Sequence, residues 1–207
     1  MSTPSPIEWI AFAGSKRVAR GTPREVAPLV QAHAQACPDA PVLIFDAHTS
    51  QLAELDLRGS SAAVLGRLPA QTSHPAPAAV AQESNASRGP GRPKLGVVAR
   101  EVTLLPRHWE WLASQPGGAS VALRKLVEQA KRANTEGDRA REARDAAYRF
   151  MHAMAGNEPG FEAASRALFA NDAAGVCAGL ARWPRDVRAH ALALAAQALP
   201  ELADARL

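Results

Sequence analysis

The pattern of apolar and polar positions over the first sixty residues predicts a small unit of strands and one helix. Short apolar or alternating runs separated by turn residues indicate strands. A helix is indicated where apolar side chains recur at helical spacing behind Thr22 as N-cap and Pro23 at the first helical position. The predicted elements, in order, are strands over 7–13 and 16–20, a helix over 23–36, and strands over 41–46 and 52–57. This order is ββαββ.

The apolar pattern disappears over residues 66–93 and returns with a helical period after residue 132. The first of these segments consists mainly of Pro, Ala, Ser, Gln and Gly, which bury too little surface to offset their ordering entropy, so it is predicted to be a flexible linker. The helices predicted after it span 138–155, 160–170, 173–181 and 184–199, with a break at 134–137.

These patterns predict the α+β class and four parts. The parts are a small α+β domain (1–66), a disordered linker that carries a short basic arm (67–93), a strand-helix-helix block (94–134) and a helical tail (135–207).

The strand-helix-helix block is the most informative segment. Residues 97–105 form a candidate strand, Pro106 opens a short helix through Ser114, and Pro116-Gly117-Gly118 breaks the chain before a second helix. The first helix is expected to bury Trp109 and Leu112; since Trp109 and Trp111 cannot share one face, one tryptophan is expected in the core and the other outside. The second helix has an apolar stripe and cations off that stripe: Leu123, Leu126, Val127 and Ala130 against Arg124, Lys125, Lys131 and Arg132.

A strand, a helix, a glycine turn and a second helix in this order resemble the ribbon-helix-helix regulators of bacterial repressors and antitoxins. The resemblance implies a dimer whose paired strands enter the major groove of DNA, with the second helix's N-terminus against a phosphate. The register of the strand stays open. The family pattern buries Glu101, Thr103 and Leu105, whereas simple alternation buries Val98, Val102 and Leu104.

Immediately before the strand, Gly91-Arg92-Pro93-Lys94 resembles the AT-hook, with Arg88 set back by Gly-Pro. The resemblance implies an extended arm in the narrow minor groove of A·T-rich DNA, where the negative potential attracts arginine.

Charge is distributed unevenly and supports a polyanionic partner. The net charge of +4 is the sum of −1 over residues 1–86, +6 over 87–149 and −1 over 150–207. A basic stretch of this kind is typical of nucleic-acid binding, and also of a solvated helix face.

Composition and motif searches exclude other classes. No apolar run approaches the ~20 residues of a membrane span, and no basic and apolar leader is visible, so a cytoplasmic location is expected. Cys37 and Cys177 have no CxxC partner, and no motif for nucleotide, metal or nucleophilic chemistry occurs. Asp46, His48 and Asp56 are the best available acid–base set, and turn chemistry explains them equally well. We expect neither an enzyme nor a cofactor.

GRPKLGV, REVTLLPRHWEWL, GGASVALRKLV, MAGNEPGFEAASRALFA and WPRDVRAHALALA are similar to a bacterial family called domain of unknown function 2239, and so is PVLIFDAHTSQLAELDLRGS in the first part. This resemblance covers nearly the whole chain and implies that its parts belong to one architecture.

Two hypotheses follow. The first is a regulator-like, dimeric DNA-binding protein; the alternative is a non-catalytic protein-interaction module whose central block packs on the C-terminal helices. The candidate nucleic-acid-binding residues are Arg88, Arg92, Lys94, Arg100, Thr103, Arg107, His108, Gly118, Ser120, Arg124 and Lys125.

Overall fold

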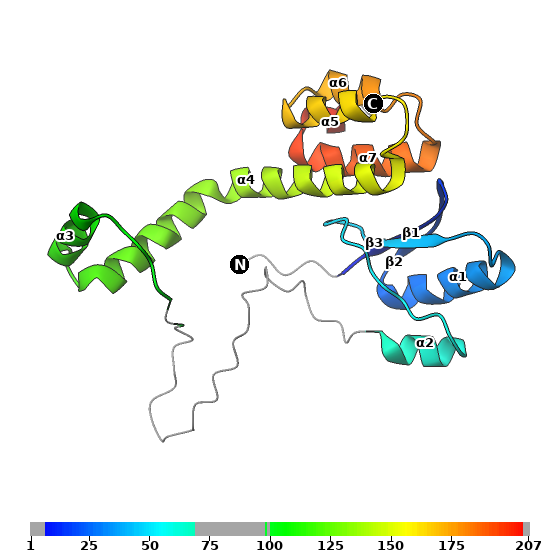
Figure 1. Ribbon diagram of the computed structural model, residues 1–207, viewed down its shortest axis with the longest axis horizontal. Helices are drawn as coiled ribbons and strands as arrows, with labels where there is room; N and C mark the ends of the chain where they lie inside the picture. Colours follow the sequence, from blue (N-terminus) through cyan, green and yellow to red (C-terminus); the bar gives the residue numbers. More distant parts are fainter. Residues whose placement is uncertain (1–6, 69–97, 99, 205–207) are drawn as a thin grey trace. The chain divides into compact units, whose positions relative to one another are not determined.

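A computed structural model describes residues 7–68, 98 and 100–204 (Figure 1). Their contacts form two units, each described here by itself. The composite unit holds residues 7–68 and 136–204, and the central unit holds residues 98 and 100–135. Both helices and an antiparallel sheet are present, which confirms the α+β class.

The sheet of the composite unit has three antiparallel strands in the order β2-β1-β3. These are β1 (Trp9–Ala13), β2 (Lys16–Gly21) and β3 (Val42–Asp46). Gly14 makes the β1–β2 turn at φ +54°, a conformation that glycine adopts without strain. The predicted hairpin and the strand after the helix are therefore confirmed. Because β1 is central, its side chains are buried on both faces of the sheet.

Helix α1 (Pro23–Ala36) covers one face of the sheet and begins and ends where the sequence predicts. Its start is fixed by the Glu25 carboxylate, which accepts a hydrogen bond from the Thr22 backbone N–H at 2.8 Å and thereby lowers the pKa of Glu25. Val26 and Val30 then pack in one cluster with Trp9, Ala11, Ala19 and Ile44.

The predicted strand over 52–57 is wrong. Only Leu52 forms a bridge, with Phe45, and the chain then leaves the sheet. Alternate side chains still turn inward, because Ala53, Leu55 and Leu57 pack against the α1 cluster without a ladder of hydrogen bonds. The Gln31 side-chain amide donates to the carbonyls of Leu57 and Gly59, which holds the crossing segment, and the unpredicted helix α2 (Ser61–Arg67) follows.

The opposite face of the sheet packs against helices. These are the second half of α4 (Gly118–Ala155), with α5 (Phe161–Phe169), α6 (Ala173–Gly179), α7 (Arg185–Ala198) and α8 (Glu201–Asp204) completing the same core. At its centre the ring centroid of Phe150 lies 5.4 Å from that of Phe12 and 5.4 Å from that of Phe45. The three predicted C-terminal helices are confirmed within two residues at each end.

Helix α4 is continuous, so the predicted break at 134–137 is wrong. Gly137 lies within the helix, and a Cβ atom at this position would have no atom within 4 Å other than the backbone of its own helix. A single glycine weakens a helix by about 1 kcal/mol relative to alanine, and the neighbouring turns of a 38-residue helix absorb this cost.

The central unit contains α3 (Pro106–Ser114), a turn and the first half of α4. Gly117 and Gly118 make the turn at φ +87° and +74°, as the predicted break requires. The predicted strand over 97–105 is wrong, because residues 98 and 100–105 belong to no strand. A strand needs a neighbour for its backbone hydrogen bonds, and the sheet formed by the described residues holds only β1, β2 and β3.

Candidate nucleic-acid interface

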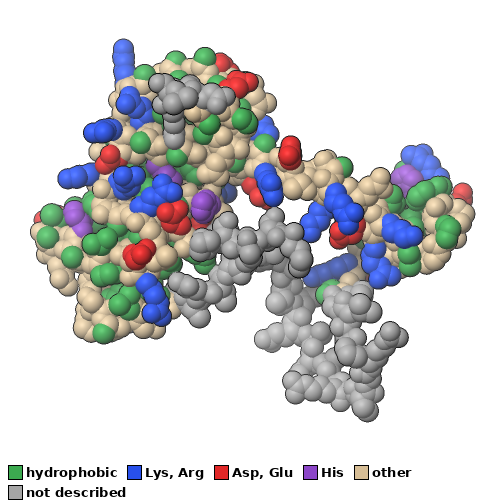
Figure 2. All heavy atoms as spheres, turned by 180° about the vertical axis from the view of Figure 1, so that it is seen from behind, with side chains coloured by type: hydrophobic (Ala, Val, Ile, Leu, Met, Phe, Trp, Pro, Cys, Tyr) green, Lys and Arg blue, Asp and Glu red, His purple; other side chains and the backbone are tan. Residues whose placement is uncertain are grey.

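Four cations line one side of α4 within the central unit. Arg124 and Lys131 are seven residues apart, as are Lys125 and Arg132, so the four project from neighbouring turns on one side. All four are exposed, and among the described residues no ion pair involves them. Figure 2 shows Lys and Arg side chains gathered over this end of α4 and over α3. We call these four residues the cationic face.

The apolar stripe of the same helix lies on the other side. With about 100° between successive residues, Leu126 and Ala130 lie about 100–160° around the axis from the four cations, whereas Val127 lies only about 40° from Lys131. The four cations therefore lie off the stripe, with Lys131 at its edge. The cationic face is therefore free to meet a polyanion while the apolar side meets something else.

The other candidate residues lie around the same hairpin. Arg100 and Thr103 are exposed in the extended segment, and Arg107 and His108 are exposed in the first turn of α3. Gly118 and Ser120 begin α4. The Arg124 Nε donates to the Ser120 carbonyl at 3.1 Å, which turns this guanidinium toward the start of the helix. Three candidates, Arg88, Arg92 and Lys94, lie outside the described residues, as does the linker from residue 69 onward.

Residues 98 and 100–105 match neither of the two predicted strand registers. Leu104 is half-buried, whereas Val98, Val102 and Leu105 are 72%, 56% and 50% exposed. Neither predicted set of alternate side chains is buried within this chain.

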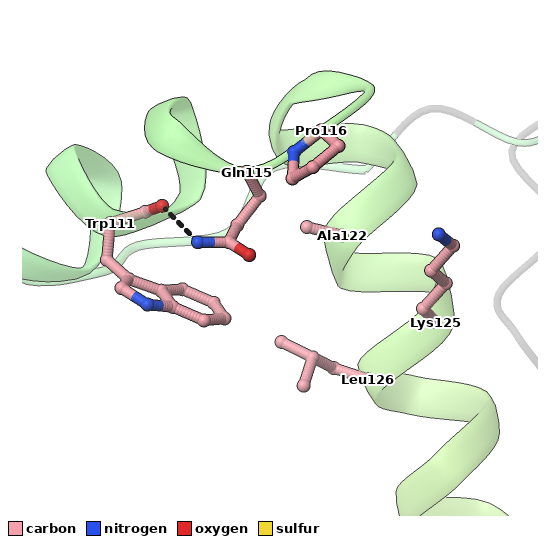
Figure 3. Close-up of a pocket in the computed structure, with 6 residues that line it drawn as sticks. All are labelled: Trp111, Gln115, Pro116, Ala122, Lys125 and Leu126. Carbon is pink, nitrogen blue, oxygen red and sulfur yellow. Dashed lines mark hydrogen bonds between the residues drawn. The ribbon is translucent and has the colours of Figure 1, made fainter.

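An apolar groove of about 190 Å³ lies between α3 and α4. It is lined by Trp111, Gln115, Pro116, Ala122, Lys125 and Leu126, and we call it the hairpin groove (Figure 3). The Trp111 ring and the Leu126 side chain face each other across it, and the Gln115 amide donates to the Trp111 carbonyl at 3.3 Å. Lys125 lines the groove while its ammonium points away from Trp111 and Leu126. The lining of this groove is mainly apolar.

Both tryptophans of α3 are exposed, which corrects the prediction that one of them is in the core. Trp109 is 42% and Trp111 is 51% exposed, and Leu112 alone is the buried residue of α3. Two exposed indoles beside cations are typical of binding surfaces.

The polar residues of the composite unit that the sequence offered for acid–base chemistry each have structural partners. Asp46 Oδ1 accepts hydrogen bonds from the backbone N–H groups of His48 and Thr49, at 3.0 and 2.8 Å, and thus caps the turn after β3. Asp56 forms ion pairs with Arg58 and Arg67, and the hydrogen bonds from Arg58 lower the pKa of Asp56 to about 2.

His190 of α7 is buried, and no pattern in the sequence indicates its burial. His190 is 5% exposed, and its ring centroid lies 4.6 Å from that of Phe150. Burial, and then the charges of Arg20 and Arg17, lower the pKa of His190 to about 4, so the imidazole is neutral at pH 7. Nearby, Glu8 forms a two-point ion pair with Arg20 at 2.9 and 3.0 Å, and this hydrogen-bonded pairing lowers the pKa of Glu8.

Neither a metal-binding cluster nor a membrane-spanning helix is found among the described residues. They contain no group of three or more His, Cys, Asp or Glu side chains arranged to hold a metal ion. None of the helices in this part of the chain has the length and hydropathy to cross a membrane. Cys37 and Cys177 are exposed free thiols.

The fold and its surfaces define an α+β protein with a dense sheet-and-helix unit and a hairpin of segregated apolar and cationic sides. The chain belongs to a family of uncharacterized proteins conserved in bacteria (DUF2239), whose family model matches residues 8–195. This confirms the family resemblance drawn from the sequence motifs. No curated protein and no solved structure matches the chain.

Proposed function

We propose that this chain is a non-catalytic, dimeric DNA-binding protein of the bacterial cytoplasm, with a regulator-like role. In this proposal the central unit binds double-stranded DNA mainly through its phosphates. The single observation that supports it most is the cationic face, whose four exposed side chains carry positive charge without a carboxylate partner among the described residues.

Physical dimensions favour this partner. An α-helix with its side chains is about 10–12 Å wide, and the major groove is about 12 Å wide. Lys131 and Arg132 lie beyond the hairpin turn on a stretch of α4 that is exposed. Arginine and lysine there gain from releasing the counterions condensed on DNA, which makes the binding strongly salt-dependent.

The remaining candidates extend the same surface. Arg107 and His108 sit at the start of α3, and Gly118 and Ser120 sit at the start of α4, where backbone N–H groups favour phosphate. Any preference for A·T-rich DNA is assigned to the arm with Arg92 and Lys94, which lies outside the described residues.

Fluorescence anisotropy with labelled A·T-rich and G·C-rich duplexes at two salt concentrations tests the proposal. Each phosphate contact contributes about −0.9 to the slope of log affinity against log salt. The double variant Lys131→Gln/Arg132→Gln is therefore expected to make the slope less steep by about 2. The matched control Arg182→Gln/Arg185→Gln removes the same charge from exposed positions of the composite unit and is expected to leave it unchanged. Equal effects of the two double variants would contradict a role for the cationic face.

The alternative function is a protein-interaction module without a nucleic-acid partner. The exposed Trp111 and the hairpin groove support it, because aromatic side chains at apolar pockets are typical of protein interfaces. Absence of binding to both duplexes at about 50 mM salt, where phosphate contacts are strongest, would favour this alternative.

A further inference from the structure

The apolar side of α4 in the central unit is longer than the helix packed on it. The nine residues of α3 span about 14 Å, whereas residues 118–135 of α4 span about 27 Å. Ala122, opposite α3, is buried, but Leu126 and Val127 are 42% and 62% exposed, and Ala130 and Ala133 are exposed as well. About half of this apolar side is uncovered by α3.

The uncovered side is continuous with the hairpin groove, since Leu126 belongs to both (Figure 3). We call the combined surface the open face. Its members are Trp111, Leu123, Leu126, Val127, Ala130 and Ala133.

The hairpin has too small a core to remain folded without cover on the open face. Its buried hydrophobic residues, within the described part of the central unit, are Leu112 and Ala122. A helix of nine residues such as α3 is marginal in water on its own, and most helix stability in proteins comes from packing of the apolar side. The hairpin is therefore expected to gain stability from a partner that covers the open face.

We propose that a second copy of this chain covers the open face. The two hairpins pack about a twofold axis, and Leu126 and Val127 of each copy lie against the hairpin groove of the other. A surface that carries an apolar pocket and a protruding apolar side chain next to each other is suited to such a self-complementary contact.

The arrangement of charge is compatible with a second copy. Lys125 lines the hairpin groove and Lys131 lies beside Val127, but the Lys125 ammonium points away from Trp111 and Leu126, which places these charges at the rim of the contact. Gln129 and Asn134 add no charge on the apolar side of the helix.

The area is enough for a weak, specific dimer. Partly exposed Trp111, Leu126 and Val127, with their smaller neighbours, offer roughly 300 Å² of apolar surface per copy. Two copies give roughly 600 Å², and since about 60% of an interface is apolar, the total is about 1,000 Å². This is near the lower limit of specific interfaces, so a dissociation constant in the micromolar range is expected.

The inference rests on the dimer that the proposed function includes, and it does not require that DNA is bound. It adds the surface through which the copies meet. It also explains why the cations project freely, because pairing through the open face leaves both cationic faces outside, where a duplex with its own twofold symmetry can meet both.

Sedimentation equilibrium of the full chain, over protein concentrations around the micromolar range, tests the inference. The wild type is expected to change from monomer to dimer, and Leu126→Asp is expected to raise the dissociation constant at least about 30-fold, because a buried charge replaces an interface anchor. The matched control Leu29→Asp changes a leucine on α1 of the composite unit that is 53% exposed, against 42% for Leu126, and should change the constant less than about twofold. Circular dichroism checks that both variants keep the fold of the composite unit.

A cross-link provides a second measurement that does not depend on weakening the dimer. In a Cys37→Ser/Cys177→Ser background, Val127→Cys is expected to be joined between copies by a short bifunctional thiol reagent, whereas Leu29→Cys is not. Leu126→Asp and wild type dimerising equally, or a wild type that stays monomeric, would overturn the inference. A monomer that co-sediments with phosphatidylserine vesicles would overturn it in favour of a membrane.

The same samples separate this inference from the proposed function. A dimer that is sensitive to Leu126→Asp but does not bind either duplex supports the inference and contradicts DNA binding. A monomer with salt-dependent duplex binding supports DNA binding and overturns the inference.

Discussion

The two units of this chain differ in where their apolar side chains go. In the composite unit, strand β1 is buried on both faces, and the aromatic rings of Phe12, Phe45 and Phe150 lie in contact at the centre of the larger core. In the central unit, large apolar side chains such as Trp111 and Val127 are more than half exposed. The first unit has a core of its own, while the second presents its apolar residues on its surface.

This difference shows that the exposed apolar side chains of the central unit have to be interpreted together with its exposed cations. An exposed apolar side is an aggregation hazard unless something covers it. In the central unit it occurs together with a cationic face on the opposite side of the same helix. A hairpin with two opposed faces suits a protein that binds a copy of itself on one side and a polyanion on the other, whereas the composite unit needs no further partner to remain folded.

The largest expected effect contrasts the two units directly. Phe150→Ala removes a fully buried ring from the composite core and is expected to lower the free energy of unfolding by about 3–5 kcal/mol. Val127→Ala changes an exposed side chain of the central unit and should cost less than about 0.5 kcal/mol in dilute protein. Urea denaturation followed by circular dichroism measures both. Equal losses would contradict the contrast in burial.

An intermediate effect concerns the buried histidine of the composite unit. The pKa of His190 is about 4 in the folded protein, against about 6.5 in an unfolded chain. Between these values the unfolded state binds the proton and the native state does not, so stability falls as the pH is lowered from 6.5 toward 4. The free energy of unfolding is expected to be about 2 kcal/mol smaller at pH 5 than at pH 7 because of this group.

Urea midpoints of wild type and His190→Leu at pH 7 and pH 5 measure this contribution. His190→Leu is expected to lose that part of the pH dependence, whereas His48→Gln, at a half-exposed position, should retain it. An identical pH dependence in wild type and His190→Leu would show that the histidine is not buried in its neutral form.

The smallest effect tests the helix that runs through both units. Gly137→Ala is expected to raise the free energy of unfolding by about 0.5–1 kcal/mol, since the position is helical with open space around it. Gly160→Ala serves as the opposite control, because at φ +92° its Cβ would lie 2.3 Å from the Gly179 carbonyl oxygen, and it should destabilise. No gain from Gly137→Ala would indicate that the helix breaks at residues 134–137 after all.

Much of the composite unit could be predicted because its signals are local. Thr22, Pro23 and Glu25 fix the start of α1 within a few residues, and breakers bound the strands on either side. The strand predicted over 52–57 was wrong because an alternating pattern indicates which side chains face inward. It does not indicate whether the backbone forms hydrogen bonds with a neighbouring strand. Its inward side chains pack as expected, while the Gln31 amide takes carbonyls that a neighbouring strand would otherwise pair.

The positions of the charged residues in the candidate site could be predicted from the sequence, but the burial of its apolar side chains could not. The positions of Arg124 and Lys125 off the apolar stripe follow from helical spacing alone. The exposure of Trp109 and Trp111 is a property of the assembled hairpin, which the spacing of residues within α3 does not indicate. The burial of His190 could not be predicted, because the alanines and leucines around it in the sequence form no pattern that marks the histidine. The rings that pack near it, Phe12 and Phe150, come from distant parts of the chain.

Hydrogen–deuterium exchange of the full chain at protein concentrations below and above the dimer dissociation constant tests the contrast between the units most directly. The account predicts that amides of α3 and of residues 118–132 gain protection as the concentration rises, because a second copy completes their core. Amides of β1, β3 and α7 should be protected equally at both concentrations. Central amides that are equally well protected in dilute protein would contradict the account, since the hairpin would then be stable without a partner.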